Sequence, residues 1–327
     1  MRSRRKLLIA TFVSLLTASV ANAADRTYFV SPHLIGPAYW TAAEIGVRQA
    51  GKDLGVNVLY NGTTTADSAS QVNMFQDMLS RHLDGVAIAP NDALAIVPAI
   101  KKARDAGIPV ITFDSDASTS ARQYYLGPAD DHDMGRQMAE FMCQQIGGKG
   151  QIAYLVAGLG VQNQIDKVAG ADAYFKEKCP GIEVVTTLES GDDQQKAFAN
   201  AQNLLQTYPD LAGIIGYAGG EPPGAAEAVE QAIKAGTLKP GQVKVTGVAV
   251  PSVMAPYLKD GTVEKAFIWD PIKLGYAAVY VIDQLGQKKQ LGDEIDIPTV
   301  GKVKVSGKNI YIGTLVITKD NAGDFKF

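Results

Sequence analysis

Short, continuous apolar runs alternate along the chain with longer segments whose apolar residues recur at helical spacing. In the first third, this pattern predicts strands at 27–31, 57–60, 86–89 and 110–113, and helices at 40–54, 68–82 and 95–106. Strands that are apolar throughout are typical of parallel sheets covered by helices on both faces. The pattern therefore predicts consecutive strand–helix–strand units.

The same alternation starts again after residue 127. It predicts helices at 133–146, 164–178, 195–208 and 224–235, and strands at 152–156, 182–185, 213–216 and 243–247. We predict an α/β fold of two similar Rossmann-like lobes with parallel sheets, joined by a multi-strand hinge. We assign 24–127 and about 252–292 to the first lobe, 128–251 and about 293–327 to the second, and hinge crossings near 125–128, 248–251 and 293–299.

The N-terminus has the order of a secretory signal peptide. Four basic side chains lie within residues 2–6, an apolar stretch follows at 7–20, and the run Ala21-Asn22-Ala23 has small residues at both outer positions. The apolar stretch is shorter than the ~20 residues that a membrane-spanning helix needs. We expect residues 1–23 to be removed and the protein to reach the periplasm; the alternative is an uncleaved anchor.

Charge and cysteine content narrow the classes of function. The chain carries 34 acidic and 31 basic residues and, outside the predicted signal peptide, has no basic cluster, which argues against nucleic-acid binding. Cys143 and Cys179 lie near the ends of consecutive predicted helices, and an oxidising compartment would permit a disulfide between them; the alternative is two buried thiols. No Cys/His spacing resembles a metal site, and we expect neither a metal nor a cofactor.

Catalytic signatures are weak. The sequence contains neither a G-x-S-x-G nucleophile motif nor a P-loop, and the glycines at 158 and 160 lack the third glycine of a dinucleotide fingerprint. Asp114 and Asp116 form a carboxylate pair, but side chains two residues apart point the same way only if the strand continues. We therefore expect a binding protein rather than an enzyme.

Polar side chains follow the predicted strands, where open α/β sheets bind ligands. Carboxylates and amides can accept hydrogen bonds from vicinal hydroxyls, and aromatic rings can cover the apolar face of a sugar. Helix capping is the alternative role for the Asp and Asn residues, and core packing for Trp40. The candidates are Asn91, Asp92, Asp114, Asp116, Gln162, Asn163, Gln164 and Tyr217 after strands, with Tyr39, Trp40 and Trp269 as aromatic covers.

Several runs resemble the ribose-binding type of periplasmic sugar receptor (type I). They are LDGVAIAPND at 83–92, AGIPVITFDSD at 106–116 and YPDL at 208–211. PHLIG at 32–36, FDSD at 113–116, FIWD at 267–270 and DIP at 296–298 are similar to the autoinducer-2 and rhamnose receptor branch. The resemblance implies ligand contacts at His33, Asp116 and Gln162, and Asp270 of the FIWD run is a further candidate. The autoinducer-2 receptors' lysine falls at His33 and their aspartate at Val161, so the same comparison argues against autoinducer-2 as the ligand.

The family resemblance implies a monomeric receptor that captures a sugar or sugar alcohol and delivers it to an ABC permease in the inner membrane. A signalling receptor for a sugar-like molecule is the alternative, because both use the same two-lobe closure. A sugar-responsive repressor of similar fold would need an N-terminal helix-turn-helix, and the predicted signal peptide takes that place.

Overall fold

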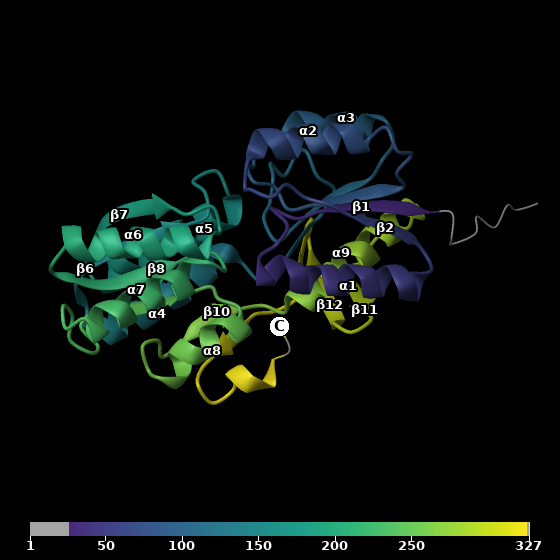
Figure 1. The fold of residues 1–327 in the computed structure, drawn as a ribbon. Coiled ribbons are helices and arrows are strands. Elements are labelled where there is room, and N and C mark those ends of the chain that lie inside the picture. Colours follow the sequence, from purple (N-terminus) through teal and green to yellow (C-terminus); the bar gives the residue numbers. More distant parts are fainter. Residues whose placement is uncertain (1–25, 326) are drawn as a thin grey trace, which may run out of the picture.

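The computed structural model describes residues 26–325 and residue 327, and these form two α/β lobes side by side (Figure 1). The signal peptide predicted at 1–23 lies outside the described residues. Within the described part of the chain, no helix has both the length and the apolarity needed to cross a membrane.

The first lobe contains an eight-stranded sheet in the order β11-β12-β13-β5-β4-β3-β1-β2. The strands from β13 to β2 are all parallel, whereas β11 and β12 extend one edge in antiparallel fashion. Their bounds are β1 (Thr27–Ser31), β2 (Asn57–Tyr60), β3 (Gly85–Ile88), β4 (Val110–Phe113), β5 (Tyr125–Gly127), β11 (Glu294–Ile297), β12 (Gly301–Ser306) and β13 (Asn309–Tyr311).

Helices cover both faces of this sheet. In Figure 1, α2 (Ser68–Met78) and α3 (Val97–Asp105) lie above it, and α1 (Ala38–Leu54) and α9 (Pro271–Gly286) lie below. Tyr28 and Phe29 are neighbours in β1, and their side chains point to opposite faces of the sheet. Tyr28 packs in the larger apolar cluster, and Phe29 packs in the cluster that includes residues of α2 and α3. This two-sided burial explains why β1, β3 and β4 are buried almost throughout and consist mainly of apolar residues.

The second lobe is built on a parallel sheet in the order β7-β6-β8-β9, to which the antiparallel pair β10-β14 is added. A bridge between Val248 and Phe267 joins the chain after β9 to β10. The bounds are α4 (Asp131–Ile146), β6 (Lys149–Val156), α5 (Gln162–Lys178), β7 (Gly181–Glu189), α6 (Gln194–Thr207), β8 (Leu211–Gly216), α7 (Glu221–Lys234), β9 (Lys244–Gly247), α8 (Pro251–Lys259), β10 (Ala266–Ile268), β14 (Leu315–Ile317) and a 3-10 turn, η2 (Ala322–Asp324).

The division of the C-terminal third between the lobes differs from the prediction, which gave about 252–292 to the first lobe and about 293–327 to the second. Strands β11 to β13 belong to the first lobe, because β13 pairs in parallel with β5, whereas α8 and β10 belong to the second. The chain therefore crosses between lobes at 127–131, 268–271 and 311–315. Only the first crossing matches an expected one. The first and third are tied together, since Ile312 N donates to Gly127 O (3.0 Å) and Gly313 N to Pro128 O (2.7 Å).

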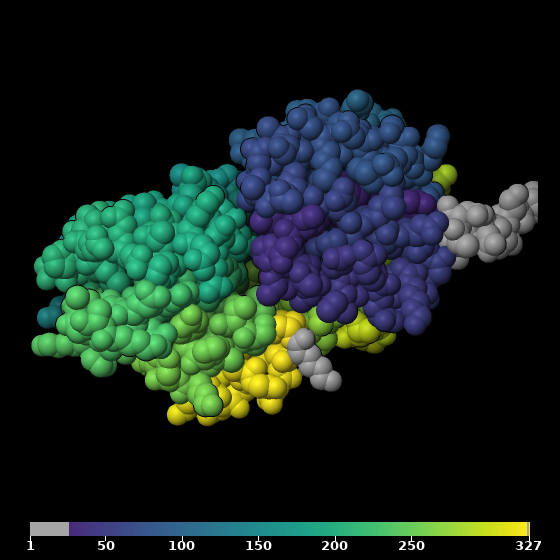
Figure 2. Space-filling view, in the orientation of Figure 1, coloured from purple at the N-terminus to yellow at the C-terminus, as the bar shows by residue number. Residues whose placement is uncertain are grey.

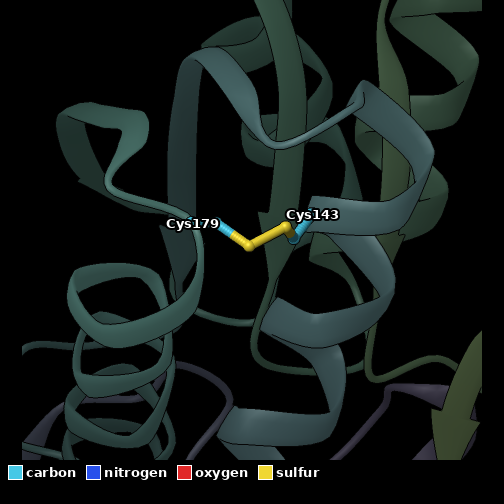
Figure 3. Close-up of a disulfide and its surroundings, with 2 residues drawn as sticks. All are labelled: Cys143 and Cys179. Carbon is cyan, nitrogen blue, oxygen red and sulfur yellow. A yellow bond between two sulfur atoms is a disulfide. The ribbon is translucent and has the colours of Figure 1, made fainter.

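The two cysteines are joined in a disulfide within the second lobe (Figure 3). Cys143 lies in the last turn of α4 and Cys179 directly follows α5, and their Cα atoms are 6.4 Å apart. That separation falls in the range that a disulfide spans without backbone movement. The bond links the ends of two helices that pack against each other.

We expect the Cys143→Ser/Cys179→Ser double variant to lose about 2–4 kcal/mol of unfolding free energy, because the cross-link restricts the unfolded chain across 36 residues. Urea unfolding measures this directly. The wild-type protein in reducing agent should show the same loss, and equal stability of the oxidised and reduced proteins would contradict the expectation.

Candidate ligand-binding site

A small cavity lies where the two lobes face each other. Figure 2 shows the purple surface of the first lobe meeting the teal and green surface of the second along this junction. The cavity, of about 30 Å³, is lined by loops that follow strands of both sheets. Leu34, Tyr39 and Asp192 line both this cavity and an outer cleft of about 480 Å³ between the lobes. The carboxyl ends of two parallel sheets thus meet at one site.

Asp114 is the central acceptor contributed by the first lobe. It directly follows β4 and is buried, and its backbone has φ 64°, a left-handed conformation that is uncommon for residues other than glycine. The Tyr39 hydroxyl donates to Asp114 Oδ1, and His33 Nε2 lies 3.5 Å from Asp114 Oδ2. Burial and the negative charge of Asp114 raise the pKa of Tyr39 well above its usual value, so the phenol stays a hydrogen-bond donor.

Aromatic rings enclose the carboxylate. Tyr39 and Trp40 are neighbours in the first turn of α1 and pack edge to face, with ring centroids 4.8 Å apart. Trp269 approaches from the crossing between β10 and α9, and its indole N–H donates to the Tyr39 hydroxyl. Tyr217, which directly follows β8, completes the set from the second lobe. These rings offer flat apolar faces beside a hydrogen-bonding centre.

The first turn of α5 brings amides across from the second lobe. Asn163 Nδ2 donates to Asp114 O (2.9 Å) and lies 3.3 Å from Asp114 Oδ2, whereas Asn163 Oδ1 is buried without a hydrogen-bond partner. Gln164 also lines the cavity, but its Oε1 accepts from Ala157 N (2.8 Å). Buried acceptors normally have partners, so Asn163 Oδ1 is a natural acceptor for a ligand hydroxyl.

A second carboxylate, Asp192, faces the cavity from the loop after β7. Like Asp114 it has a left-handed backbone, with φ 57°, and its Oδ1 accepts from Gly220 N (2.9 Å). Burial raises its pKa to about 6, although the Gly220 amide opposes the shift. Behind it, burial and the charge of Asp192 raise the pKa of fully buried Glu221 to about 8. Glu221 accepts a hydrogen bond from the Ser190 hydroxyl.

The raised pKa of Glu221 predicts a pH effect on stability. The folded protein holds this proton up to about pH 8, whereas the unfolded carboxyl releases it near its ordinary value of 4.5. The favourable contribution is therefore present below pH 4.5 and is lost as the pH rises through 8. We expect the unfolding free energy of the wild type to fall from pH 5 to pH 8 relative to Glu221→Gln. Parallel pH profiles of the two proteins, measured by urea unfolding, would contradict the assignment.

A buried ion pair supports the site from behind. Lys167 of α5 is fully buried, and its Nζ lies 2.6 Å from Asp131 Oδ1 and 3.2 Å from Asn163 O. The ammonium also lies 5.2 Å from the Trp269 ring centroid. Burial raises the pKa of Asp131 to about 6, although the charge of Lys167 opposes the shift. The pair thus connects the crossing at 127–131 with the crossing that carries Trp269.

Eight of the residues singled out from sequence line the cavity, and five do not. Those that line it are His33, Tyr39, Trp40, Asp114, Asn163, Gln164, Tyr217 and Trp269. Those that lie elsewhere are Asn91, Asp92, Asp116, Gln162 and Asp270.

Asp116 and Gln162 lie outside this cavity, on a separate hollow. Asp116 is held in a two-point ion pair by Arg122, with Nη2–Oδ2 at 2.6 Å and Nε–Oδ1 at 3.0 Å. The left-handed turn at Asp114 separates the two aspartates, so that Asp116 faces a hollow of about 220 Å³ beside the hinge. Gln162 lines the same hollow and donates to Asp166 Oδ1 (2.8 Å).

Asp270, Asn91 and Asp92 make hydrogen bonds within the protein and do not line the cavity. Asp270 caps α9, where its carboxylate accepts from Lys273 N (3.0 Å). Asn91 bonds to His33 and lies behind it. Its neighbour Asp92 caps the following turn by accepting from Leu94 N and Ala95 N, both at 2.8 Å. Asp92 therefore has the capping role that the sequence left open for it, whereas Asn91 makes no capping bond.

Asp192 is the polar lining side chain that sequence reasoning did not reach. It stands in the run Ser190-Gly191-Asp192-Asp193, directly after β7, and Asp193 is the N-cap of α6. The position after a strand was an available signal. The adjacent capping aspartate makes the run look like an ordinary helix start.

Comparison with known proteins agrees with this arrangement. A model of the periplasmic binding protein domain matches residues 28–290. The D-ribose/D-allose-binding protein of Pseudomonas aeruginosa is 30% identical over 206 residues, which are 60% of this chain and 61% of that protein.

Solved structures align over almost the whole chain. A solute-binding protein of an ABC transporter from Burkholderia graminis, in complex with D-arabinose, has a TM-score of 0.82 and 27% identity, covering 94% of this chain and 99% of the other. LsrB from Clostridium saccharobutylicum, in complex with AI-2, has a TM-score of 0.84 and 26% identity, covering 92% and 100%. With two lobes, a cavity between them and a family match across most of its length, this chain belongs to the periplasmic binding protein family.

Proposed function

We propose that this protein is the periplasmic receptor of an ABC importer, that it binds a sugar or sugar alcohol between its lobes, and that it catalyses no reaction. The observation that carries the proposal is the convergence of carboxylates, an unpartnered amide oxygen and aromatic rings from both lobes on one buried cavity. Such a set suits a ligand with several hydroxyls and an apolar C–H face. Its partner would be the permease in the inner membrane, which it would meet as a monomer.

The charge of the cavity favours an uncharged ligand. Among the described residues, the lining contains Asp114 and Asp192 but neither lysine nor arginine. A carboxylate or phosphate on the ligand would face both aspartates without a lysine or arginine to compensate their charge. The sugar-binding relatives and the arabinose-bound structure support the same class of ligand.

A thermal-shift screen of pentoses, hexoses, deoxysugars and polyols tests the proposal, because a ligand that binds only the folded state raises its melting temperature. We expect a dose-dependent rise with at least one neutral sugar or polyol, and no rise with D-glucuronate or ribose 5-phosphate. A shift with the acidic compounds alone would overturn the ligand class, and no shift with any compound would overturn the proposed function.

The mechanism would be closure of the two lobes on the ligand about the three crossings. The loops after β3 and β6 touch in the closed arrangement, where Ala93 N donates to Gly160 O (3.2 Å). A Cβ on Gly160 would lie 2.6 Å from Asp92 Oδ2, and Asp92 is held in place by its capping bonds. A ligand that contacts both lobes would favour this closed state by differential affinity.

We therefore expect Gly160→Ala to weaken ligand binding by roughly tenfold, because overpacking of this kind costs about 1–3 kcal/mol and acts only in the closed state. Calorimetry with the best sugar from the screen measures it. Gly158→Ala in the same loop is the matched control, since its nearest contact would be Val161 Cγ2 at 3.3 Å. Equal affinities for the two variants would contradict closure at this contact.

A further inference from the structure

Behind the cavity, the buried side-chain amides of Gln71 and Asn91 form a chain of hydrogen bonds, here called the relay, that ends on the ring of His33. Gln71 of α2 is buried and uses all of its side-chain groups: Nε2 donates to Pro32 O (3.1 Å) and Ala89 O (2.8 Å), and Oε1 accepts from Asn91 N (2.9 Å). Gln71 therefore clamps together the loops that follow β1 and β3. These two loops carry His33 and Asn91.

Asn91 in turn holds His33 through two hydrogen bonds. Its Nδ2 donates to His33 O (2.9 Å), so the amide group has one orientation and Oδ1 is the atom 2.8 Å from His33 Nδ1. An amide oxygen only accepts hydrogen bonds, so the ring nitrogen facing it must carry the proton. The other ring nitrogen, Nε2, is directed toward Asp114, 3.5 Å from Oδ2.

We propose that Gln71 and Asn91 are positioning residues for ligand binding: they fix His33 with its proton on Nδ1 and its Nε2 beside Asp114, so that these two atoms form one recognition edge. In the neutral ring Nε2 is an acceptor, and with Asp114 it presents two neighbouring acceptors to vicinal hydroxyls of the ligand. A ring free to turn, or with the proton on Nε2, would present a donor there instead. This role rests on the proposed function for its ligand, but the state of the His33 ring does not.

The first test needs no ligand. Protein labelled with ¹⁵N in histidine should show, for the His33 ring at pH 8, a protonated Nδ1 and an unprotonated Nε2; a His33→Gln variant assigns the signal among the three histidines. Asn91→Leu removes both bonds to His33 and should shift the ring toward the Nε2-protonated form. Asn91→Asp keeps an acceptor for Nδ1 and should retain the wild-type pattern. An Nε2-protonated ring in the wild type would overturn the proposal, whatever the protein binds.

The second test is affinity, with D-arabinose and D-ribose as the first probes and the best compound of the screen thereafter. We expect Asn91→Leu and Gln71→Met to weaken binding about 10-fold to 100-fold, and Asn91→Asp to restore most of it. Gln76→Met replaces an exposed glutamine of the same helix α2 and is the matched control for Gln71→Met, so it should bind as the wild type does. Asn91→Leu that binds within twofold of the wild type would reject the positioning role. If the His33 ring carries its proton on Nδ1 but the protein binds no sugar, the proposed function is rejected, and the claim that Gln71 and Asn91 fix the His33 ring still holds.

Discussion

Replacement of Asp114 by asparagine is expected to weaken sugar binding by roughly 10-fold to 150-fold, the largest effect of any single change in the cavity. Hydrogen bonds to a charged group contribute about 1.5–3 kcal/mol, and every 1.4 kcal/mol is a factor of ten in affinity. Asparagine keeps the size of the side chain and tolerates the left-handed backbone at this position, where φ is 64°. Titration calorimetry with the sugar found in the screen measures the change.

Asp116→Asn is the matched control two residues away. The Asp116 carboxylate forms an ion pair with Arg122 outside the cavity, so we expect the affinity of Asp116→Asn to stay within about threefold of the wild type. We also expect some loss of stability, because Arg122 is almost fully buried and loses its charged partner. The reverse result, in which Asp116→Asn abolishes binding and Asp114→Asn does not, would show that the aspartates have been assigned the wrong way round.

The second large effect concerns stability. Lys167→Met should lower the unfolding free energy by about 3–5 kcal/mol, because it leaves the buried Asp131 carboxylate without its cation. Asp131 would keep the Tyr125 hydroxyl, at 3.1 Å, as a partner. Denaturant unfolding at neutral pH measures the loss.

Two further variants separate this effect from a general loss of a lysine. Lys167→Met/Asp131→Asn removes both charges and should recover most of the stability. Lys234→Met breaks the exposed pair with Glu230 on α7 and should cost less than about 1 kcal/mol. If Lys167→Met and Lys234→Met have similar effects, the buried pair does not hold the second lobe and the hinge together as described.

The strand–helix alternation made the two-lobe α/β fold predictable, because parallel strands covered on both faces are apolar throughout and stand out in the sequence. The tail was not predictable in the same way. Strands β11, β12 and β13 are short, and their outward side chains are polar, so nothing in their pattern shows which sheet they extend. Only the pairing of β13 with β5 places them in the first lobe.

The position of a loop directly after a strand correctly predicted several of the loops that line the cavity. It did not predict which side chain of each loop faces the cavity. Asp114 and Asp116 differ because of the backbone turn at Asp114 and the ion pair with Arg122, six residues after Asp116, and neither feature could be recognised from the strand–helix pattern. Gln162 and Asn163 are adjacent, yet their places on the first turn of α5 direct only Asn163 to the cavity. Side-chain direction at a helix start depends on the register of the helix, which the sequence pattern leaves uncertain by a residue or two.

The most direct test of ligand binding between the lobes is intrinsic tryptophan fluorescence. The chain contains two tryptophans, and Trp40 and Trp269 both line the cavity. We predict that the sugar which raises the melting temperature also changes the tryptophan emission, saturably and with one molecule per chain, and reduces quenching by acrylamide. A sugar that stabilises the protein while leaving emission and quenching unchanged would bind elsewhere, and that result would contradict the account.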